Sequence, residues 1–117
     1  MEIEINGKNY PLTFGFDFID YVNKENGMEA DGMKTNIGGA AMLNAGLQGR
    51  MPSSLRLLIK GATVTLPQKP SNKAIEEYID ELADDDEAYN AVFDSVSEEL
   101  GKRPAIRREM GIMKKVK

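Results

Sequence analysis

Alternation of apolar and polar positions at the start of the chain predicts a β-hairpin. Residues 2–5 and 8–13 alternate on either side of Asn6-Gly7, a pair that accepts the positive φ angles of a two-residue turn. This turn places two pairs of residues opposite one another, Ile3 with Tyr10 and Ile5 with Lys8. Pro11 cannot donate to a strand pair, so the second strand should have an edge that faces solvent there. An isolated hairpin is marginal in water, so it should pack against helices.

Helical periodicity dominates the rest of the chain. Four apolar stripes are clear. The first is Phe14, Phe18, Tyr21 and Val22 (helix 15–26); the second is Leu55, Leu58, Ile59 and Ala62; the third is Ile75, Tyr78, Ile79 and Leu82; and the fourth is Ala88, Tyr89, Val92, Phe93, Val96 and Leu100. We expect Ser53 and Ser71 to cap the second and third of these helices. Residues 28–36 read as an exposed loop, and residues 63–66 as a short extended piece. The predicted fold is mainly α (α+β), with an N-terminal β-hairpin packed on a bundle of about five helices.

The fifth expected helix, Ile37 to Met51, is rich in glycine, alanine and methionine. Each glycine inside a helix costs about 1 kcal/mol relative to alanine, so this helix should be weak alone. Its small side chains favour close packing within the monomer. The alternative is a mobile, apolar surface that becomes ordered when it binds a partner.

Composition removes several classes of function. The chain has no cysteine and no histidine, so it lacks thiolate nucleophiles, disulfides and the commonest general base and transition-metal ligand. The acidic run Asp84–Glu87 lacks the alternate carboxylate spacing and the glycine of a calcium loop, and it fits a helix start better. Neither a phosphate-binding glycine motif nor a serine with a base partner is present. We therefore expect no enzyme activity, no metal site and no cofactor.

Charge is unevenly distributed along the chain. Residues 102–117 hold seven basic side chains and one acidic one, whereas the preceding residues hold eight basic and eighteen acidic ones. We expect a single domain over residues 1–101 and a basic C-terminal tail over residues 102–117. The tail has three interpretations: a frayed terminus, a phosphate-binding segment that uses Arg107, Arg108, Lys114 and Lys115, or a short partner-binding helix that uses Ile106, Met110 and Met113. Gly111 would weaken that helix.

Two further features bear on location and partners. No segment has the 18 or more apolar residues of a membrane span, and the acidic start differs from a secretory signal, so we expect a cytoplasmic protein. Most of the seven methionines fall outside the clean apolar stripes. Because methionine adapts its shape to varied apolar partners, their position in the least regular segments favours a binding surface.

The order of these parts resembles the small tail assembly chaperones of long-tailed phages that infect Gram-positive bacteria. The matching parts are the opening hairpin Glu2–Leu12, the Phe-rich helix from Phe14 to Asn26-Gly27, the Gly/Ala/Met-rich middle, the segment Pro70–Asp80 and a final acidic helix. The resemblance covers about residues 1–100 and none of these motifs is catalytic. The basic tail does not match the family pattern.

The resemblance implies a protein that binds the tape measure protein and keeps it soluble during tail tube assembly, with the tail tube protein as a second candidate partner. Such a chaperone acts in the host cytoplasm and is absent from the mature virion. We expect Met42, Leu43, Leu47 and Met51 to form the contact surface. The sequence does not decide whether the protein forms a homo-oligomer. There are two alternatives. One is a small regulatory or nucleic-acid-binding protein that acts through the basic tail, although the acidic body argues against nucleic acid. The other is a structural tail or head component.

Overall fold

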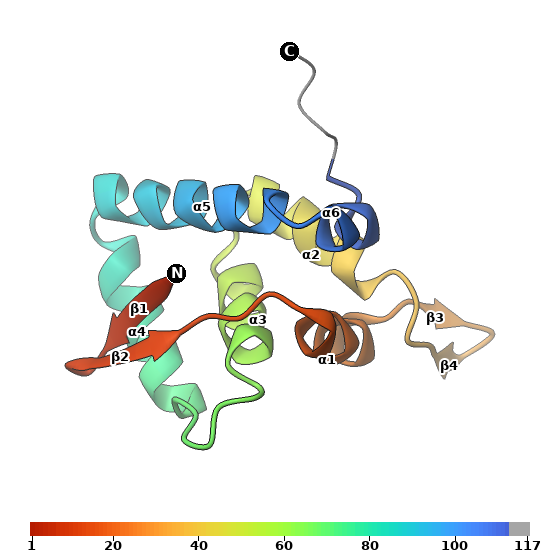
Figure 1. Ribbon diagram of the computed structural model, residues 1–117, viewed down its shortest axis with the longest axis horizontal. Coiled ribbons are helices and arrows are strands. Elements are labelled where there is room, and N and C mark those ends of the chain that lie inside the picture. The colour runs from red at the N-terminus through yellow and green to blue at the C-terminus, as the bar shows by residue number, and fades with distance from the viewer. Residues whose placement is uncertain (113–117) are drawn as a thin grey trace, which may run out of the picture.

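The computed structural model describes residues 1–112, which form six helices and two small β-hairpins (Figure 1). The elements are β1 (Glu2–Ile5), β2 (Lys8–Pro11), α1 (Phe16–Asn26), β3 (Glu29–Ala30), β4 (Met33–Lys34), α2 (Gly39–Gln48), α3 (Pro52–Ala62), α4 (Asn72–Ala83), α5 (Asp86–Gly101) and α6 (Pro104–Met110). The predicted fold class, mainly α with an N-terminal hairpin, is confirmed.

The first hairpin has the predicted turn and register. Asn6 and Gly7 have φ angles of 54° and 76°, and the register pairs Ile3 with Tyr10 and Ile5 with Lys8. The side chain of Ile3 is buried together with those of Ile5 and Leu12, while the glutamates between them face water. The hairpin is therefore held to the helices by one apolar face, as its alternation predicts.

The helices form two layers around one apolar core. Helix α3 packs between α1 and α4, and α2, α5 and α6 lie across these three (Figure 1). The buried core is made of Ile3, Ile5, Leu12, Phe14, Phe18, Ile19, Val22, Ala40, Leu43, Leu47, Leu55, Leu58, Ile59, Ala62, Ile75, Ile79, Phe93, Val96, Leu100, Ile106 and Met110. All four predicted stripes contribute to it, because apolar residues at helical spacing share one face.

Helix α2 begins in close contact with α1. A Cβ atom on Gly39 would lie 2.7 Å from the Val22 carbonyl oxygen and 2.8 Å from Asn23 Cα, so only glycine fits there. Asn23 Oδ1 accepts a hydrogen bond from the Ala40 N–H at 2.9 Å, and Ala40 is fully buried. One side of α2 is thus packed tightly in the monomer, which was the favoured reading of this segment.

Local predictions failed at three places. Residues 28–36 are exposed but include the hairpin β3–β4, which turns at Asp31-Gly32 with φ angles of 53° and 77°. Ser53 is not an N-cap, because α3 begins at Pro52 and Met51 precedes it. Residues 63–66 form turns rather than a strand, since the Thr63 hydroxyl and N–H both bond to the Ile59 carbonyl oxygen. In contrast, Ser71 accepts a hydrogen bond from the Ala74 N–H as predicted.

The basic segment after Gly101 is not frayed over residues 104–110. These residues form α6, which buries Ile106 and Met110 against α1, α2 and α5. Met110 is thus a core residue and not part of a partner-binding helix face. Gly111 ends the helix with a φ angle of 72°, and the Ile112 N–H bonds to the Arg107 carbonyl oxygen at 2.8 Å, as in a glycine C-cap. Met113, Lys114 and Lys115 lie outside the described residues.

Candidate protein-binding surface

Most of the large apolar side chains that are exposed lie in or near α2. Among residues 1–112, six such side chains have exposed fractions between 52% and 72%. They are Phe16, Met28, Met33, Ile37, Met42 and Met51. Five of the six lie in or next to the segment that runs from β3 to the start of α3. Exposed apolar side chains that gather in one place are typical of a surface that binds another protein.

Contacts join several of these side chains into one strip along the outside of α2. Met42, Ala45 and Gly49 follow one another at helical spacing, so they lie on one side of the helix. A Cβ atom on Gly49 would lie 3.7 Å from Met51 Cγ, so the Met51 side chain extends this row at the C-terminal end. At the N-terminal end a Cβ atom on Gly38 would lie 2.9 Å from the Met28 sulfur. We call Met28, Met42, Ala45, Gly49 and Met51 the apolar strip.

Helix α2 carries no charged residue, so nothing on it opposes the docking of an apolar segment. Two of the four predicted contact residues, Met42 and Met51, lie on the strip. The other two, Leu43 and Leu47, are 1% and 3% exposed and lie in the core. Leu43 and Leu47 therefore lie on the buried side of α2 and are not accessible to a partner in this conformation. Periodicity within α2 distinguishes the two sets, since positions 40, 43 and 47 share the buried side.

The β3–β4 hairpin projects from the body as an arm and carries further apolar side chains (Figure 1). Met33 is 72% exposed on β4, and Ile37 is 70% exposed where the arm returns to α2. The Met28 N–H bonds to the Ile37 carbonyl oxygen at 3.0 Å, which closes the base of the arm. Since Met28 contacts Gly38, the arm adjoins the apolar strip. The sequence signal for the arm was the Asp31-Gly32 turn pair, which the loop interpretation overlooked.

Arg50 fixes the end of the strip to α5. Its backbone has a φ angle of 53°, and its guanidinium donates to the Asn90 carbonyl oxygen at 2.8 Å and pairs with Asp94 at 2.5 Å. The Tyr89 hydroxyl donates to the Arg50 carbonyl oxygen. Burial raises the pKa of the Tyr89 hydroxyl, and the nearby Arg50 charge partly opposes this. These contacts hold the turn that positions Met51.

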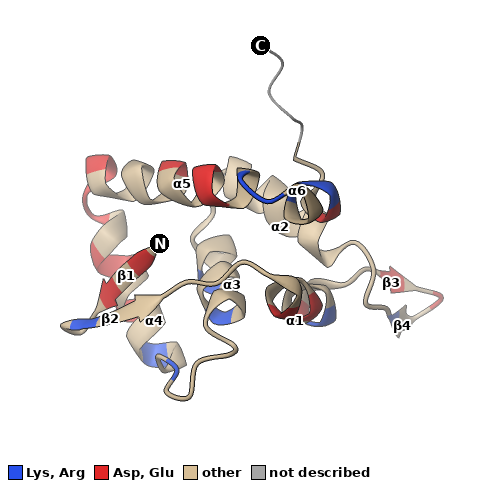
Figure 2. Ribbon diagram, in the orientation of Figure 1, with Lys and Arg blue, Asp and Glu red and all other residues tan. Residues whose placement is uncertain are grey.

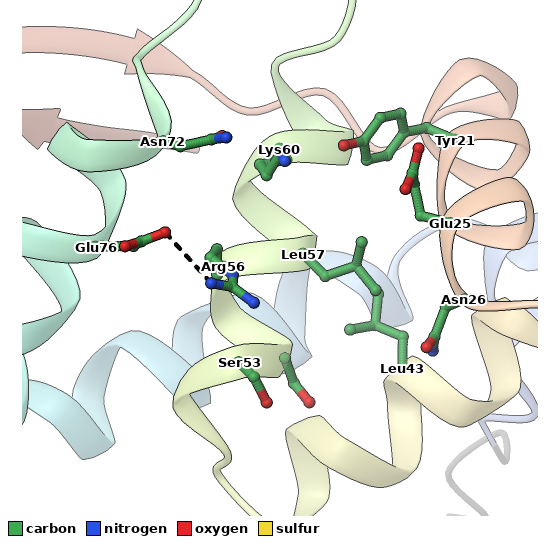
Figure 3. Close-up of a pocket in the computed structure, with 11 residues that line it drawn as sticks. Tyr21, Glu25, Asn26, Leu43, Ser53, Arg56, Leu57, Lys60, Asn72 and Glu76 are labelled. Atoms are coloured by element: carbon green, nitrogen blue, oxygen red, sulfur yellow. Dashed lines mark hydrogen bonds and ion pairs between the residues drawn. The ribbon is translucent and has the colours of Figure 1, made fainter.

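A polar groove on another side of α3 offers a second hollow, of about 340 Å³ (Figure 3). It lies between α1 and α4, with Leu43 and Leu57 at its base. Its other labelled lining residues are polar: Tyr21, Glu25, Asn26, Ser53, Arg56, Lys60, Asn72 and Glu76. Arg56 and Glu76 form an ion pair at 3.3 Å across it. The polar lining suits an apolar segment less well than the strip does.

No group of three or more acidic side chains in residues 1–112 is placed to hold a metal ion. The carboxylates of α4 lie on its exposed side, and Asp85 caps α5 by accepting a hydrogen bond from the Ala88 N–H at 3.1 Å. No helix in this part of the chain has both the length and the apolar character that crossing a bilayer requires.

A family model of phage tail assembly chaperone proteins (TAC) matches residues 2–114. The chain belongs to this family. Comparison with curated proteins and with solved structures gave no match. The match includes α6, so the tail assembly chaperone family extends beyond the first hundred residues that carried the resemblance. A chaperone family indicates a non-enzymatic role with protein partners in tail assembly, and the apolar strip is a surface suited to such a role.

Proposed function

We propose that this tail assembly chaperone binds apolar helical segments of the tape measure protein on the apolar strip and keeps them soluble until the tail tube forms around them. The observation that carries the proposal is the uncharged, exposed side of α2, flanked by the exposed methionines Met28 and Met51. Methionine side chains are flexible and polarisable, so they adapt to varied apolar sequences. A long partner with many different apolar segments needs a surface of this kind.

Charge elsewhere on the molecule fits this role. Many of the glutamates and aspartates lie on β1, α4 and α5, with others on α1 and β3, whereas the α2 ribbon has no charged residue (Figure 2). Net negative charge keeps the free chaperone and its complex soluble, while the strip covers the apolar partner. We place this activity in the host cytoplasm and expect the protein to be absent from finished virions, which mass spectrometry of purified particles tests.

The basic segment supports nucleic-acid binding less well. Arg103 and Arg107 each donate a guanidinium hydrogen bond within the chain, to the carbonyl oxygens of Phe14 and Gly101 at 2.9 Å. These groups are therefore partly engaged, and no aromatic side chain interleaves them for base stacking. Binding to duplex DNA that is tight and falls steeply with added salt would favour the regulatory alternative instead.

Co-expression with a tape measure fragment tests the proposed chaperone function. The soluble yield of the fragment is measured with the wild-type protein, with Met42→Glu/Met51→Glu, and with Ala91→Glu/Ser97→Glu as a charge-matched control on the exposed side of α5. Both methionines are half exposed, so the double variant should keep its fold, which thermal unfolding checks. A charge buried against an apolar helix should lower the yield about tenfold, whereas the control should keep it. Equal rescue by all three proteins would refute the proposal.

A further inference from the structure

The register of the first hairpin determines which backbone groups face away from the sheet. Ile5 and Lys8 flank a two-residue turn, so they form a hydrogen-bonded pair, and such pairs alternate along antiparallel strands. The Leu12 N–H bonds to the Met1 carbonyl oxygen at 2.9 Å, which fits this alternation. The N–H and C=O groups of Glu2 and Glu4 therefore point outward from β1, as those of Asn9 do from β2.

The two edges of this sheet differ in what they offer a further strand. On β2 the second outward position is Pro11, which has no N–H, and the Lys8 ammonium is tied to Gln68 at 2.8 Å beside that edge. On β1 both outward positions keep a donor and an acceptor. Within residues 1–112 no hydrogen bond engages these groups of Glu2 and Glu4. An unpaired strand edge of this kind is a template for the addition of another strand.

Charge selects which strand can be added. The Glu2 and Glu4 side chains are exposed on the face opposite Ile3, and neither carboxylate takes part in an ion pair within the described chain. Figure 2 shows that β1 is acidic and lies near the acidic α4–α5 end of the molecule. An added strand places its own side chains directly across from these glutamates, where opposite charges attract and like charges repel. Acidic strands are therefore excluded and basic ones favoured.

The other face of the added strand would meet an apolar surface. Ile3 and Ile5 are buried in the core, and β1 packs against α4, where Tyr78 and Leu82 are only partly buried. Side chains that alternate with the basic ones would extend this apolar face. We propose that the outer edge of β1 binds an extended polypeptide segment, in which Lys or Arg alternates with apolar residues, as a third strand of the sheet. This site is distinct from the apolar strip on α2 and independent of its function.

A synthetic peptide of alternating valine and lysine, with a valine–glutamate peptide of equal length as its control, probes this edge on the full-length protein. NMR titration should show that the lysine peptide binds and the glutamate peptide does not. Hydrogen exchange of the Glu4 amide should slow when the lysine peptide binds, because this amide becomes a donor to the new strand. Equal binding of the two peptides, or an unchanged Glu4 exchange rate, would overturn the proposal.

Two variants separate strand pairing from simple charge attraction. Glu4→Ala removes the carboxylate and keeps the backbone N–H, whereas Glu4→Pro removes both. The Glu4 N–H donates no hydrogen bond to β2, so the sheet should accept a proline at this position as it accepts Pro11 on the opposite strand. Glu4→Pro should bind the lysine peptide about fivefold more weakly than Glu4→Ala, the effect of one lost hydrogen bond. Equal affinities would refute strand addition. If Glu4→Pro unfolds, a lysine peptide N-methylated on the edge facing β1 must lose binding to the wild-type protein instead. If the wild-type protein self-associates and Glu4→Pro abolishes this self-association, the β1 edge binds a second copy of the chain, and the proposed partner is wrong.

Discussion

Truncation of Ile106 to alanine tests whether α6 is an integral part of the folded chaperone. Ile106 is 2% exposed, in a seven-residue helix that packs on α1, α2 and α5. The change removes three carbon groups, each worth about 0.8 kcal/mol of transfer free energy, or about 2.4 kcal/mol together. A residual cavity adds to this loss, and buried isoleucine-to-alanine changes cost about 2–5 kcal/mol. We expect a loss of about 3 kcal/mol in the free energy of unfolding.

Urea unfolding followed by circular dichroism measures this loss. With a denaturant slope of about 2 kcal/mol/M for a domain of this size, the midpoint should fall by about 1.5 M. The matched control is Arg108→Ala on the same helix, because the Arg108 side chain is exposed and makes no hydrogen bond or ion pair within residues 1–112. That variant should stay within about 0.5 kcal/mol of wild type. An Ile106→Ala protein as stable as the control would mean that α6 is not docked, as in a frayed terminus.

Two further predictions concern close packing and pH. Gly39→Ala should destabilise the protein by more than about 1 kcal/mol despite the better helix propensity of alanine, because the new methyl group meets backbone atoms of α1. The control Gly101→Ala, which meets nothing within 4 Å, should be neutral or stabilising in the same urea assay, and equal effects would contradict this packing. Burial raises the pKa of the Tyr78 hydroxyl above its usual value near 10, so the stability from this group is complete below pH 10 and is lost as pH rises through the raised pKa. Unfolding free energies measured from pH 8 to pH 11 should therefore fall less in Tyr78→Phe than in wild type, and parallel curves would refute this.

The sequence predicted those elements whose signals are local. The hairpin follows from Asn6-Gly7 between alternating positions, and α4 follows from Ser71 before a regular apolar stripe. Both appear with the expected contacts because turn chemistry and capping act over a few residues. Failures arose where a local signal was ambiguous. Thr63 is β-branched and was read as extended, but its hydroxyl bonds back to Ile59 and continues the end of α3 as a turn.

The tail was harder because its structure depends on distant contacts. The isolated seven residues of α6 are too short to be a stable helix in water. They fold because Ile106 and Met110 meet a surface made by α1, α2 and α5, and because the Arg103 guanidinium reaches the Phe14 carbonyl oxygen 89 positions away. Helical spacing of Ile106 and Met110 was visible in the sequence, but spacing alone does not separate a core-facing helix from a partner-facing one.

Helix α2 packs in the monomer on one side, and its other side carries the surface that we propose for binding. Its glycines and alanines let α1 and α3 approach closely, since Gly39 meets the α1 backbone and a Cβ atom on Gly46 would lie 1.9 Å from the Ser54 Oγ atom. Such a helix gains its stability from tertiary packing on its buried side rather than from intrinsic propensity. The stability of the helix therefore does not depend on charged side chains on its outward side. The alternatives drawn from the sequence, close packing or an apolar binding surface, are thus compatible, because the packing involves the buried side and the proposed binding involves the exposed side of the same helix.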